Sequence, residues 1–307
     1  MSDKLAVEFD PAKRRQYIID MQRILLDDAA TLIFGYPRTN MVSRTGLEVK
    51  NVDVSYGDKL TVTNANLELD KGEILSIVGE SGSGKTTVIR AIMGCLPGAG
   101  RVSAGSIIFE GRNLLQNTPQ DWRDMSGKEM SMIFQDSGNM INPIRRIGEQ
   151  FIDYIQTHSP ATSKDEAYKM ATQMLASVHL PNPENIMNSY PFELSGGMRQ
   201  RVGIAMAMIF SPKILLADEP TSALDVTTQA QIIRQIIDVR NEYKAAVIIV
   251  THNLGVASYM SNKIMVMKDG KVVESGPREE IIGNPKHEYT KQLLQAVPVI
   301  GGKRYYE

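Results

Sequence analysis

Cysteine is almost absent from this chain, and so are long apolar runs and any excess of charge of one sign. A single cysteine, Cys95, occurs among the 307 residues, which excludes an internal disulfide and a cysteine-rich metal site. Its apolar neighbours predict a small buried side chain. No stretch approaches the roughly 18 consecutive apolar residues of a membrane-spanning helix. The formal net charge of -1 provides no basic field that would attract nucleic acid.

The first residues also lack an apolar core. Acidic and basic residues alternate from Met1 to Arg15, which is unlike a secretory signal. We therefore expect the protein in the cytoplasm, with any membrane contact made through a partner. Across residues 1–46, apolar side chains first recur at helical spacing and then form a short run, Thr31–Phe34. This pattern predicts a helix and a short strand in a peripheral N-terminal extension.

A β pattern begins at Leu47. Apolar residues spread along Leu47–Val54 and Val62–Leu69 predict two strands, and Ile74–Val78 has the continuous apolar run of a strand buried on both faces. Similar runs lie at Met130–Phe134, Ile214–Ala217 and Val247–Val250, the last core strand that the pattern indicates. Because helical stretches lie between these runs, we predict an α/β fold with a mainly parallel sheet. Residues from about 136 to 193 have helical patterning only, which predicts an inserted helical lobe.

A phosphate-binding loop follows the strand at Ile74–Val78. Gly79, Gly84, Lys85 and Thr86 have the spacing of a P-loop between a strand and a helix. Glycines let backbone N–H groups point at phosphate oxygens, and the start of the helix offers its positive end to the same anion. Lys85 provides a mobile charge, and the Thr86 hydroxyl is a ligand suited to Mg²⁺. The residues expected to bind the nucleotide here are Gly79, Ser81, Gly82, Ser83, Gly84, Lys85, Thr86 and Thr87.

Two acids end the apolar run at Ile214–Ala217. Asp218 stands at the strand tip, where it can hold Mg²⁺, usually through water. Glu219 is placed one residue further on to polarise an attacking water as general base. Taken alone, the pair could be two solvated loop acids, but the P-loop upstream favours the catalytic interpretation.

A second glycine-rich loop opens a helix at Leu194–Arg201, and such a loop is a second anion site. This segment resembles the signature loop of ABC ATPases, with Met198 where many members carry glutamine. In that family two subunits sandwich two nucleotides head to tail. The resemblance implies that Ser195 and Gly197 meet the γ-phosphate of ATP held by a partner subunit, and Gly196 belongs to the same nucleotide-binding loop.

Other residues fall in the order of the family's motifs. Tyr56 resembles the aromatic residue that stacks on adenine, although a core tyrosine is an alternative. Gln135 resembles the glutamine that senses Mg²⁺ and contacts the membrane subunit, and Asp225, in Ser222–Asp225, resembles the loop that crosses the dimer interface. A lone histidine is usually structural, but the place of His252 after a core strand resembles that of the switch histidine that contacts the γ-phosphate.

The resemblance extends over residues 47–297 and implies the ABC ATPase fold. That fold has a P-loop core with a mainly parallel sheet, an N-terminal antiparallel β subdomain and an inserted helical subdomain at about 136–193. Residues 298–307 are then a short C-terminal tail. The resemblance also implies ATP and Mg²⁺ as ligands, with Thr86, Gln135 and Asp218 at the metal.

Three segments resemble the branch of importers for peptides and nickel. They are Met132–Asp136 with Asn142-Pro143 and Ile147–Gln150 after it, Met198–Arg201, and His287–Leu294. Ser137 and Asn253 depart from this pattern, because proline and aspartate are usual there. Many members of the branch carry a cysteine cluster near the C-terminus. This chain has none there, so we expect no iron–sulfur cluster.

The N-terminal extension has a resemblance of its own. Asp10–Arg14, Gln22–Ala29 and Tyr36-Pro37 resemble the last part of the extracellular binding proteins that serve these transporters. The segment could be a fusion remnant or the tail of a neighbouring gene, or an ordinary accessory helix and strand. Some 45 residues cannot form a two-lobed ligand cleft, so no ligand-binding role follows.

The resemblance implies an ATPase that powers an importer from the cytoplasmic face of the membrane. The expected partners are a second ABC ATPase subunit, either a paralogue or a second copy, two membrane-spanning permease subunits, and, indirectly, an extracellular solute-binding protein. A soluble ABC ATPase acting on nucleic acid or ribosomes and a regulator without turnover are the alternatives. Dipeptides, oligopeptides, nickel chelates and opine-like metallophores all remain open as cargo.

Overall fold

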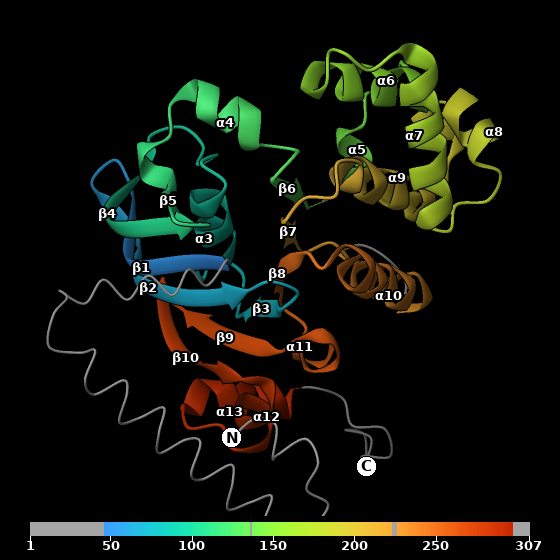
Figure 1. Cartoon of the computed structure of the whole chain (residues 1–307). Coiled ribbons are helices and arrows are strands. Elements are labelled where there is room, and N and C mark those ends of the chain that lie inside the picture. The colour runs from blue at the N-terminus through green and yellow to red at the C-terminus, as the bar shows by residue number, and fades with distance from the viewer. Residues whose placement is uncertain (1–45, 136, 223–225, 297–307) are drawn as a thin grey trace, which may run out of the picture. The chain divides into compact units, whose positions relative to one another are not determined.

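The computed structural model describes residues 46–135, 137–222 and 226–296, all within the unit Arg44–Glu307. The expectations for residues 1–45, for the C-terminal tail and for Asp225 lie outside this described part. A 10-stranded sheet forms its framework, in the order β5-β4-β1-β2-β10-β9-β3-β8-β7-β6 (Figure 1). The strands are β1 (Gly46–Tyr56), β2 (Lys59–Asp70), β3 (Ile74–Val78), β4 (Gly100–Phe109), β5 (Arg112–Asn113), β6 (Met130–Ile133), β7 (Ile214–Asp218), β8 (Ala246–Thr251), β9 (Lys263–Lys268) and β10 (Lys271–Pro277).

The sheet has an antiparallel and a parallel part. Strands β5, β4, β1 and β2 pair antiparallel, whereas β9, β3, β8, β7 and β6 pair parallel. Strand β10 pairs antiparallel with β9 and meets β2 at one residue pair, Lys271 with Thr63. The predicted fold class, with a parallel core and an antiparallel N-terminal part, is confirmed.

Successive residues of the central strands face different apolar clusters. In β7, Leu215 and Ala217 join a cluster that includes the helical lobe, whereas Ile214 and Leu216 join a cluster that includes α3 and the antiparallel strands. Every residue of β3, β7 and β8 is buried. A strand that is covered on both faces favours apolar side chains on both, which explains the nearly continuous apolar runs in the sequence. Ser76 of β3 is the polar exception, and its hydroxyl is hydrogen-bonded to that of Ser261.

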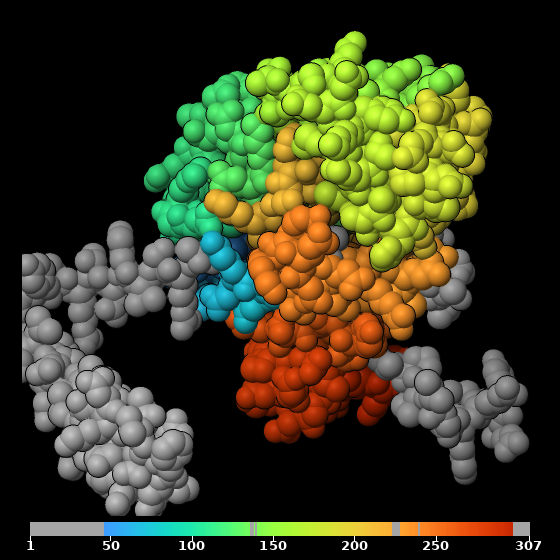
Figure 2. Space-filling model, turned by 45° about the vertical axis from the view of Figure 1, so that its right-hand side comes forward, coloured from blue at the N-terminus to red at the C-terminus, as the bar shows by residue number. Residues whose placement is uncertain are grey.

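The helices cover the sheet and form the predicted lobe, which lies at the opposite end of the described part from the C-terminal helices in Figure 2. The α-helices are α3 (Lys85–Ile92), α4 (Pro119–Met125), α5 (Ser137–Met140), α6 (Ile147–His158), α7 (Lys164–Ser177), α8 (Pro183–Asn188), α9 (Gly196–Met208), α10 (Val226–Tyr243), α11 (Leu254–Met260), α12 (Arg278–Gly283) and α13 (Glu288–Gln295). Short 3-10 turns lie at Leu114–Gln116 and Pro191–Glu193. Within the described ranges, no helix is long and apolar enough to cross a membrane.

Several features differ from the sequence expectations. Strands β4, β5, β9 and β10 were not predicted, and β8 is therefore not the last core strand, because β9 follows it and pairs with β3. Cys95 is exposed rather than buried. It lies past the end of α3, where its N–H donates to the Arg90 carbonyl at 2.9 Å. The prediction that Cys95 is buried, which rested on its apolar neighbours, is therefore wrong.

Candidate functional site

The P-loop joins β3 to α3, and two of its glycines stand where other strands come close. A Cβ at Gly79 would lie 2.2 Å from the Met267 carbonyl oxygen, which no side chain could tolerate. Gly84 precedes α3 with a φ of 99°, in the left-handed region that favours glycine. The loop is therefore shaped by its packing against β9 as well as by its own sequence.

Lys85 folds back over this loop. Its Nζ donates to the carbonyl oxygens of Gly79 at 2.8 Å and Glu80 at 2.6 Å, and the residue is 4% exposed. Burial lowers the pKa of the Lys85 ammonium, and the carboxylates of Glu219 and Asp218 oppose that shift. The lysine is thus held at the loop by backbone oxygens in an acidic setting.

Thr86 and Asp218 meet beside the lysine. The Thr86 hydroxyl donates to Oδ1 of Asp218 at 2.8 Å. Asp218, the last residue of β7, is 1% exposed, and this burial raises its pKa although the Thr86 hydrogen bond and the Arg90 guanidinium oppose the rise. A hydroxyl and one carboxylate are the protein ligands that Mg²⁺ takes together with phosphate oxygens, so these residues fit the predicted metal site.

Glu219 has a backbone conformation that is rare outside glycine. Its φ is 43°, in the left-handed region. The conformation is held by hydrogen bonds, because the Glu219 N–H donates to the Val250 carbonyl at 3.0 Å and its carbonyl accepts from both the N–H and the hydroxyl of Ser222. Oε2 of Glu219 lies 3.5 Å from Nδ1 of His252, which follows β8. Strain held in this way is common at functional sites.

A cavity of about 310 Å³ brings most of these residues together. Its described lining residues are Thr61, Ser81, Gly82, Gly84, Lys85, Thr86, Thr87, Gln135 and Glu219. All except Thr61 were predicted. Thr61 comes from β2, and no local motif marks it, because only the pairing of strands brings it to the loop.

Tyr56 lies apart from this set. It ends β1, is partly buried and packs against the apolar cluster of the antiparallel strands. The described residues of the 310 Å³ cavity do not include it. Its stacking on adenine therefore stays a prediction, and the packing agrees with the alternative of a core tyrosine.

The signature loop also lies outside the cavity. Ser195 precedes α9, where its Oγ accepts a hydrogen bond from the Met198 N–H at 3.3 Å. Ser195 and Gly196 are exposed, and a Cβ at Gly197 would lie 2.9 Å from Cγ2 of Thr228. The anion site predicted at this helix is thus open to a second molecule rather than to the P-loop of its own chain.

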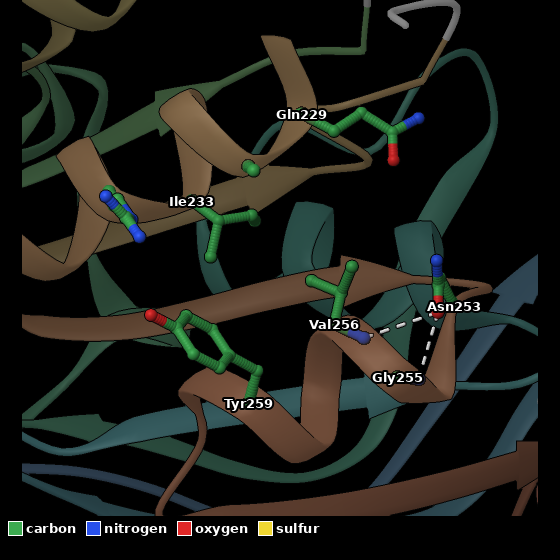
Figure 3. A pocket seen from close by; sticks show the side chains of 8 residues that line it. Gln229, Ile233, Asn253, Gly255, Val256 and Tyr259 are labelled. Carbon is green, nitrogen blue, oxygen red and sulfur yellow. Dashed lines mark hydrogen bonds between the residues drawn. The ribbon is translucent and has the colours of Figure 1, made fainter. Parts of the chain in front are cut away.

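A larger cavity of about 430 Å³ lies between α10 and α11 (Figure 3). Ile233, Val256 and Tyr259 give it apolar walls, and its described lining includes none of the predicted nucleotide contacts. Asn253 lies at its edge and caps α11, because its Oδ1 accepts from the N–H groups of Gly255 and Val256. Since a phosphate needs converging donors, the smaller polar cavity is the candidate site.

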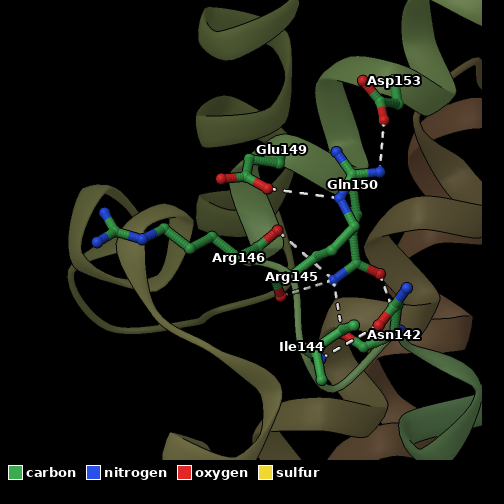
Figure 4. A network of polar contacts seen from close by, with 7 residues as sticks. All are labelled: Asn142, Ile144, Arg145, Arg146, Glu149, Gln150 and Asp153. Carbon is green, nitrogen blue, oxygen red and sulfur yellow. Dashed lines mark hydrogen bonds and ion pairs between the residues drawn. The ribbon is translucent and has the colours of Figure 1, made fainter.

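Gln150 of α6 shapes the loop between α5 and α6. Its amide NH₂ donates to the carbonyls of Asn142 at 3.1 Å and Arg145 at 3.0 Å, and its Oε1 accepts from the Asn142 N–H at 2.9 Å (Figure 4). Arg145 also pairs with Asp153 at 2.6 Å. One side chain therefore fixes both ends of this loop.

Comparison with known families agrees with this geometry. A family model described as "ABC transporter" matches residues 62–222, and a model described as "Oligopeptide/dipeptide transporter, C-terminal region" matches residues 273–306. The chain belongs to the ABC transporter family. The predicted membership of the ABC ATPases and of their peptide and nickel importer branch, and the predicted fold, are thereby confirmed.

Individual relatives extend this result. A dipeptide transport ATP-binding protein of Lactococcus lactis is 41% identical over 264 residues, which is 85% of this chain and 76% of that protein. An oligopeptide transport ATP-binding protein of Bacillus subtilis is 42% identical over 83% of this chain and 72% of its own length. A dimeric ATP-binding cassette solved in a post-hydrolysis state with ADP and Pi superposes with a TM-score of 0.65 at 29% identity, over 76% of this chain and 98% of that one.

Proposed function

We propose that this chain binds and hydrolyses ATP and thereby drives an ABC importer for peptides or a related small nutrient. The observation that carries the proposal is the hydrogen bond between Thr86 of the P-loop and the buried Asp218, with Glu219 and Lys85 at the same cavity. The relatives are ATP-binding proteins of dipeptide and oligopeptide transport, which supports the transport role.

Each residue of the site has a distinct task in this proposal. The loop N–H groups and Lys85 would hold the phosphates, and the oxygens of Thr86 and Asp218, with Gln135, would hold Mg²⁺. The bound ion would neutralise phosphate charge as it develops. Glu219 accepts the proton of the attacking water, and His252 lies 3.5 Å from it, where its ring can also meet the γ-phosphate.

The second half of each site comes from a partner ATPase subunit. Ser195 and Gly196 are exposed at the start of a 13-residue helix, and the N-terminus of a helix attracts anions. In the proposed dimer they meet the nucleotide of the other subunit, together with Gly197 and Asp225. We favour a paralogue as the partner over a second copy of this chain.

The helical lobe is the proposed contact with two membrane-spanning permeases at the cytoplasmic face. Met140 and Ile144, which follow Gln135 in the chain, are 63% and 81% exposed although both are apolar. Exposed apolar side chains beside a nucleotide-contacting loop fit a protein interface. The cargo, whether dipeptide, oligopeptide, nickel chelate or opine-like metallophore, would reach the permeases from a solute-binding protein.

Replacing Glu219 by glutamine tests the hydrolytic role. Glu219→Gln keeps the size and hydrogen bonding of the side chain but removes its basicity. Turnover should fall by roughly 10²-fold or more, with the Kd for MgATP changed by less than about 2-fold. Steady-state phosphate release and equilibrium nucleotide binding measure the two quantities on the purified chain with its ATPase partner.

A matched control separates catalysis from charge. Glu68→Gln changes an exposed acid of β2 in the same way and should leave both quantities unaltered. Normal phosphate release by the Glu219 variant would contradict the base assignment. Absence of MgATP binding by the wild-type chain would contradict the proposed function as a whole.

A further inference from the structure

The C-terminal helix α13 contacts the P-loop directly. The backbone N–H of Glu80, the second residue of the loop, donates to the hydroxyl of Tyr289 at 2.9 Å, across 209 residues of sequence. Tyr289 belongs to the segment His287–Leu294, which the sequence marks only by its resemblance to one branch of importers. The hydrogen bond gives this segment a physical link to the nucleotide site.

The tyrosine is firmly placed. It is 4% exposed, and its ring belongs to an apolar cluster with Val78, the last residue of β3, and Val266 of β9. The Lys268 ammonium lies 4.7 Å from the ring centroid, within the range of a cation–π contact. Burial raises the pKa of the Tyr289 phenol, and although the Glu80 N–H opposes this shift, the Glu80 carboxylate and Asp269 add to it. The group is therefore a neutral hydroxyl at physiological pH.

The start of α13 is anchored by a second set of hydrogen bonds. Glu274 of β10 accepts from the N–H groups of Lys286 at 2.7 Å and His287 at 3.1 Å. His287 then caps the helix, because its Nδ1 accepts from the Tyr289 N–H at 3.1 Å. These hydrogen bonds hold the start of α13 in place, so that the Tyr289 hydroxyl lies beside the P-loop.

The peptide that carries this N–H, Gly79–Glu80, also contacts Lys85, because the Gly79 carbonyl accepts from Lys85 Nζ at 2.8 Å. The Glu80 carbonyl accepts from Lys85 Nζ at 2.6 Å and from the Ser83 N–H at 3.2 Å. Nearby, the Gly270 N–H of the β9–β10 turn donates to the Ser83 carbonyl at 3.1 Å. Tyr289 and Gly270, both from the C-terminal region, thus hydrogen-bond to the backbone of the loop. The N–H that Tyr289 holds is in the same peptide as the Gly79 oxygen that binds Lys85.

We propose that Tyr289 is a positioning residue for nucleotide binding, through which the C-terminal region sets the affinity of the P-loop for ATP phosphates. The proposal rests on the proposed ATP-binding function. Without the hydroxyl, the Glu80 N–H loses its acceptor and the loop is free to rotate this peptide. The loop and Lys85 would then have to be ordered by the phosphates themselves, which lowers affinity.

Removing the hydroxyl alone tests the inference. In the full-length chain with its ATPase partner, Tyr289→Phe keeps the ring in its apolar cluster and deletes one hydrogen-bond acceptor. We expect the Kd for MgATP and for MgADP, and the KM for ATP, to rise about 3- to 10-fold, as one hydrogen bond would allow. Turnover at saturating ATP should change by less than about 2-fold, because the hydroxyl touches no reacting atom.

The control is Tyr259→Phe, which removes a hydroxyl from an exposed tyrosine of α11 and should change neither constant. Thermal melting gives an independent readout, since the rise in Tm on adding MgATP depends on affinity. That rise should be smaller in the Tyr289 variant than in the wild type at the same ATP concentration. A merely structural role would lower Tm equally with and without nucleotide.

The outcomes are distinguishable. An unchanged Kd in Tyr289→Phe, whatever its Tm, would overturn the positioning role. A fall in turnover at saturating ATP as large as the rise in KM would also overturn it, because it would indicate a part in the chemical step. Failure of the wild-type chain to bind MgATP would instead reject the proposed function, whereas normal wild-type binding with an unaffected variant rejects this inference alone.

Discussion

Asp218 and Glu219 are neighbours in the sequence but lie in unlike surroundings. Asp218 is 1% exposed at the end of β7, whereas the Glu219 side chain is 20% exposed at the rim of the cavity. A buried carboxylate loses hydration that a single hydroxyl donor and a nearby guanidinium restore only in part. Asp218 is therefore suited to bind a cation, whereas Glu219 remains accessible to water.

The buried acid predicts a conflict between stability and function. Asp218→Asn keeps the acceptor for Thr86 at Oδ1 but removes the buried charge. At pH 7 the nucleotide-free protein should melt higher than the wild type, by a few degrees, since about 1 kcal/mol corresponds to roughly 2–4 °C for a domain of this size. The further rise in Tm on adding MgATP should largely disappear, because the metal loses its carboxylate.

The pH dependence of this difference follows from the raised pKa of Asp218. The folded state holds the proton more tightly than the unfolded chain does, so the stability from that proton is present at low pH. It is lost as the pH rises through the folded-state pKa. The gap in Tm between Asp218→Asn and the wild type should therefore close on acidification below that pKa. A gap that stays constant with pH would show that the charge is not its cause.

At this scale the sequence indicated which residues meet better than it indicated their conformation. The run Ile214–Ala217 followed by two acids, together with the P-loop upstream, gave the roles of Asp218 and Glu219, which stay predictions, and the structure places Asp218 on Thr86 and Glu219 at the cavity. Nothing local to Glu219 indicates a φ of 43°, because that conformation depends on Val250 from another strand. Thr61 and Tyr289 escaped prediction for the same reason, since each reaches the loop through tertiary pairing.

Among the elements, the loop before α6 depends on one side chain. The Gln150 amide satisfies the N–H and carbonyl of Asn142 and the carbonyl of Arg145. Gln150→Ala should lower the stability of the protein by about 1–2 kcal/mol, because these backbone groups lose their partners. Hydrogen exchange at residues 142–146 should accelerate, while the Kd for MgATP stays within about 2-fold.

Gln156→Ala is the matched control on the same helix. Its amide donates to the Thr162 carbonyl at 3.0 Å, away from the loop. Exchange at residues 142–146 should be unaffected in this variant. Equal exchange in both variants and the wild type would show that the loop is held by something other than Gln150.

Two of the strands that escaped prediction differ in the signal that their sequences carry. Strand β4 contains Gly100, Gly105 and two serines, and none of its first seven residues is buried, so most of its length has neither alternation nor an apolar run. It is a strand because β1 pairs along its length. Strand β9 is buried over Ile264–Met267, a run as long as the predicted ones at Ile214–Ala217 and Val247–Val250, so a signal for this strand is present in the sequence, and β9 pairs with β3.

At the scale of the whole molecule, one chain carries two predicted phosphate-binding elements that do not share a cavity. The signature loop is exposed at Ser195 and is absent from the described lining of the P-loop cavity. In the proposed function, a complete site would therefore combine two ATPase subunits. Ser195→Arg should preserve MgATP binding by the single subunit but abolish ATP-driven association, because a bulky cation would fill the partner's γ-phosphate position.

Sedimentation in the presence and absence of MgATP measures this association, with the subunit alone and with its paralogue. Ser177→Arg, on α7, adds the same charge and bulk elsewhere and should associate normally. Mixing the Ser195 variant with Lys85→Ala chains should restore at most one composite site. Normal ATP hydrolysis by the isolated Ser195 variant as a monomer would refute the shared site.

The hydrogen bond between Glu80 and Tyr289 also has a consequence for biosynthesis. The 209 residues that separate them take a ribosome about 10–40 s to add at roughly 5–20 residues per second. For most of that interval β3 also lacks both of its neighbours in the sheet, because β8 and β9 begin only at Ala246 and Lys263. The nascent protein thus carries an apolar strand that lacks both neighbours until β8 is added, and a phosphate loop that lacks the Tyr289 contact until α13 is added. Premature termination before Tyr289 would release a chain whose central strand is formed but whose nucleotide loop still lacks its C-terminal support.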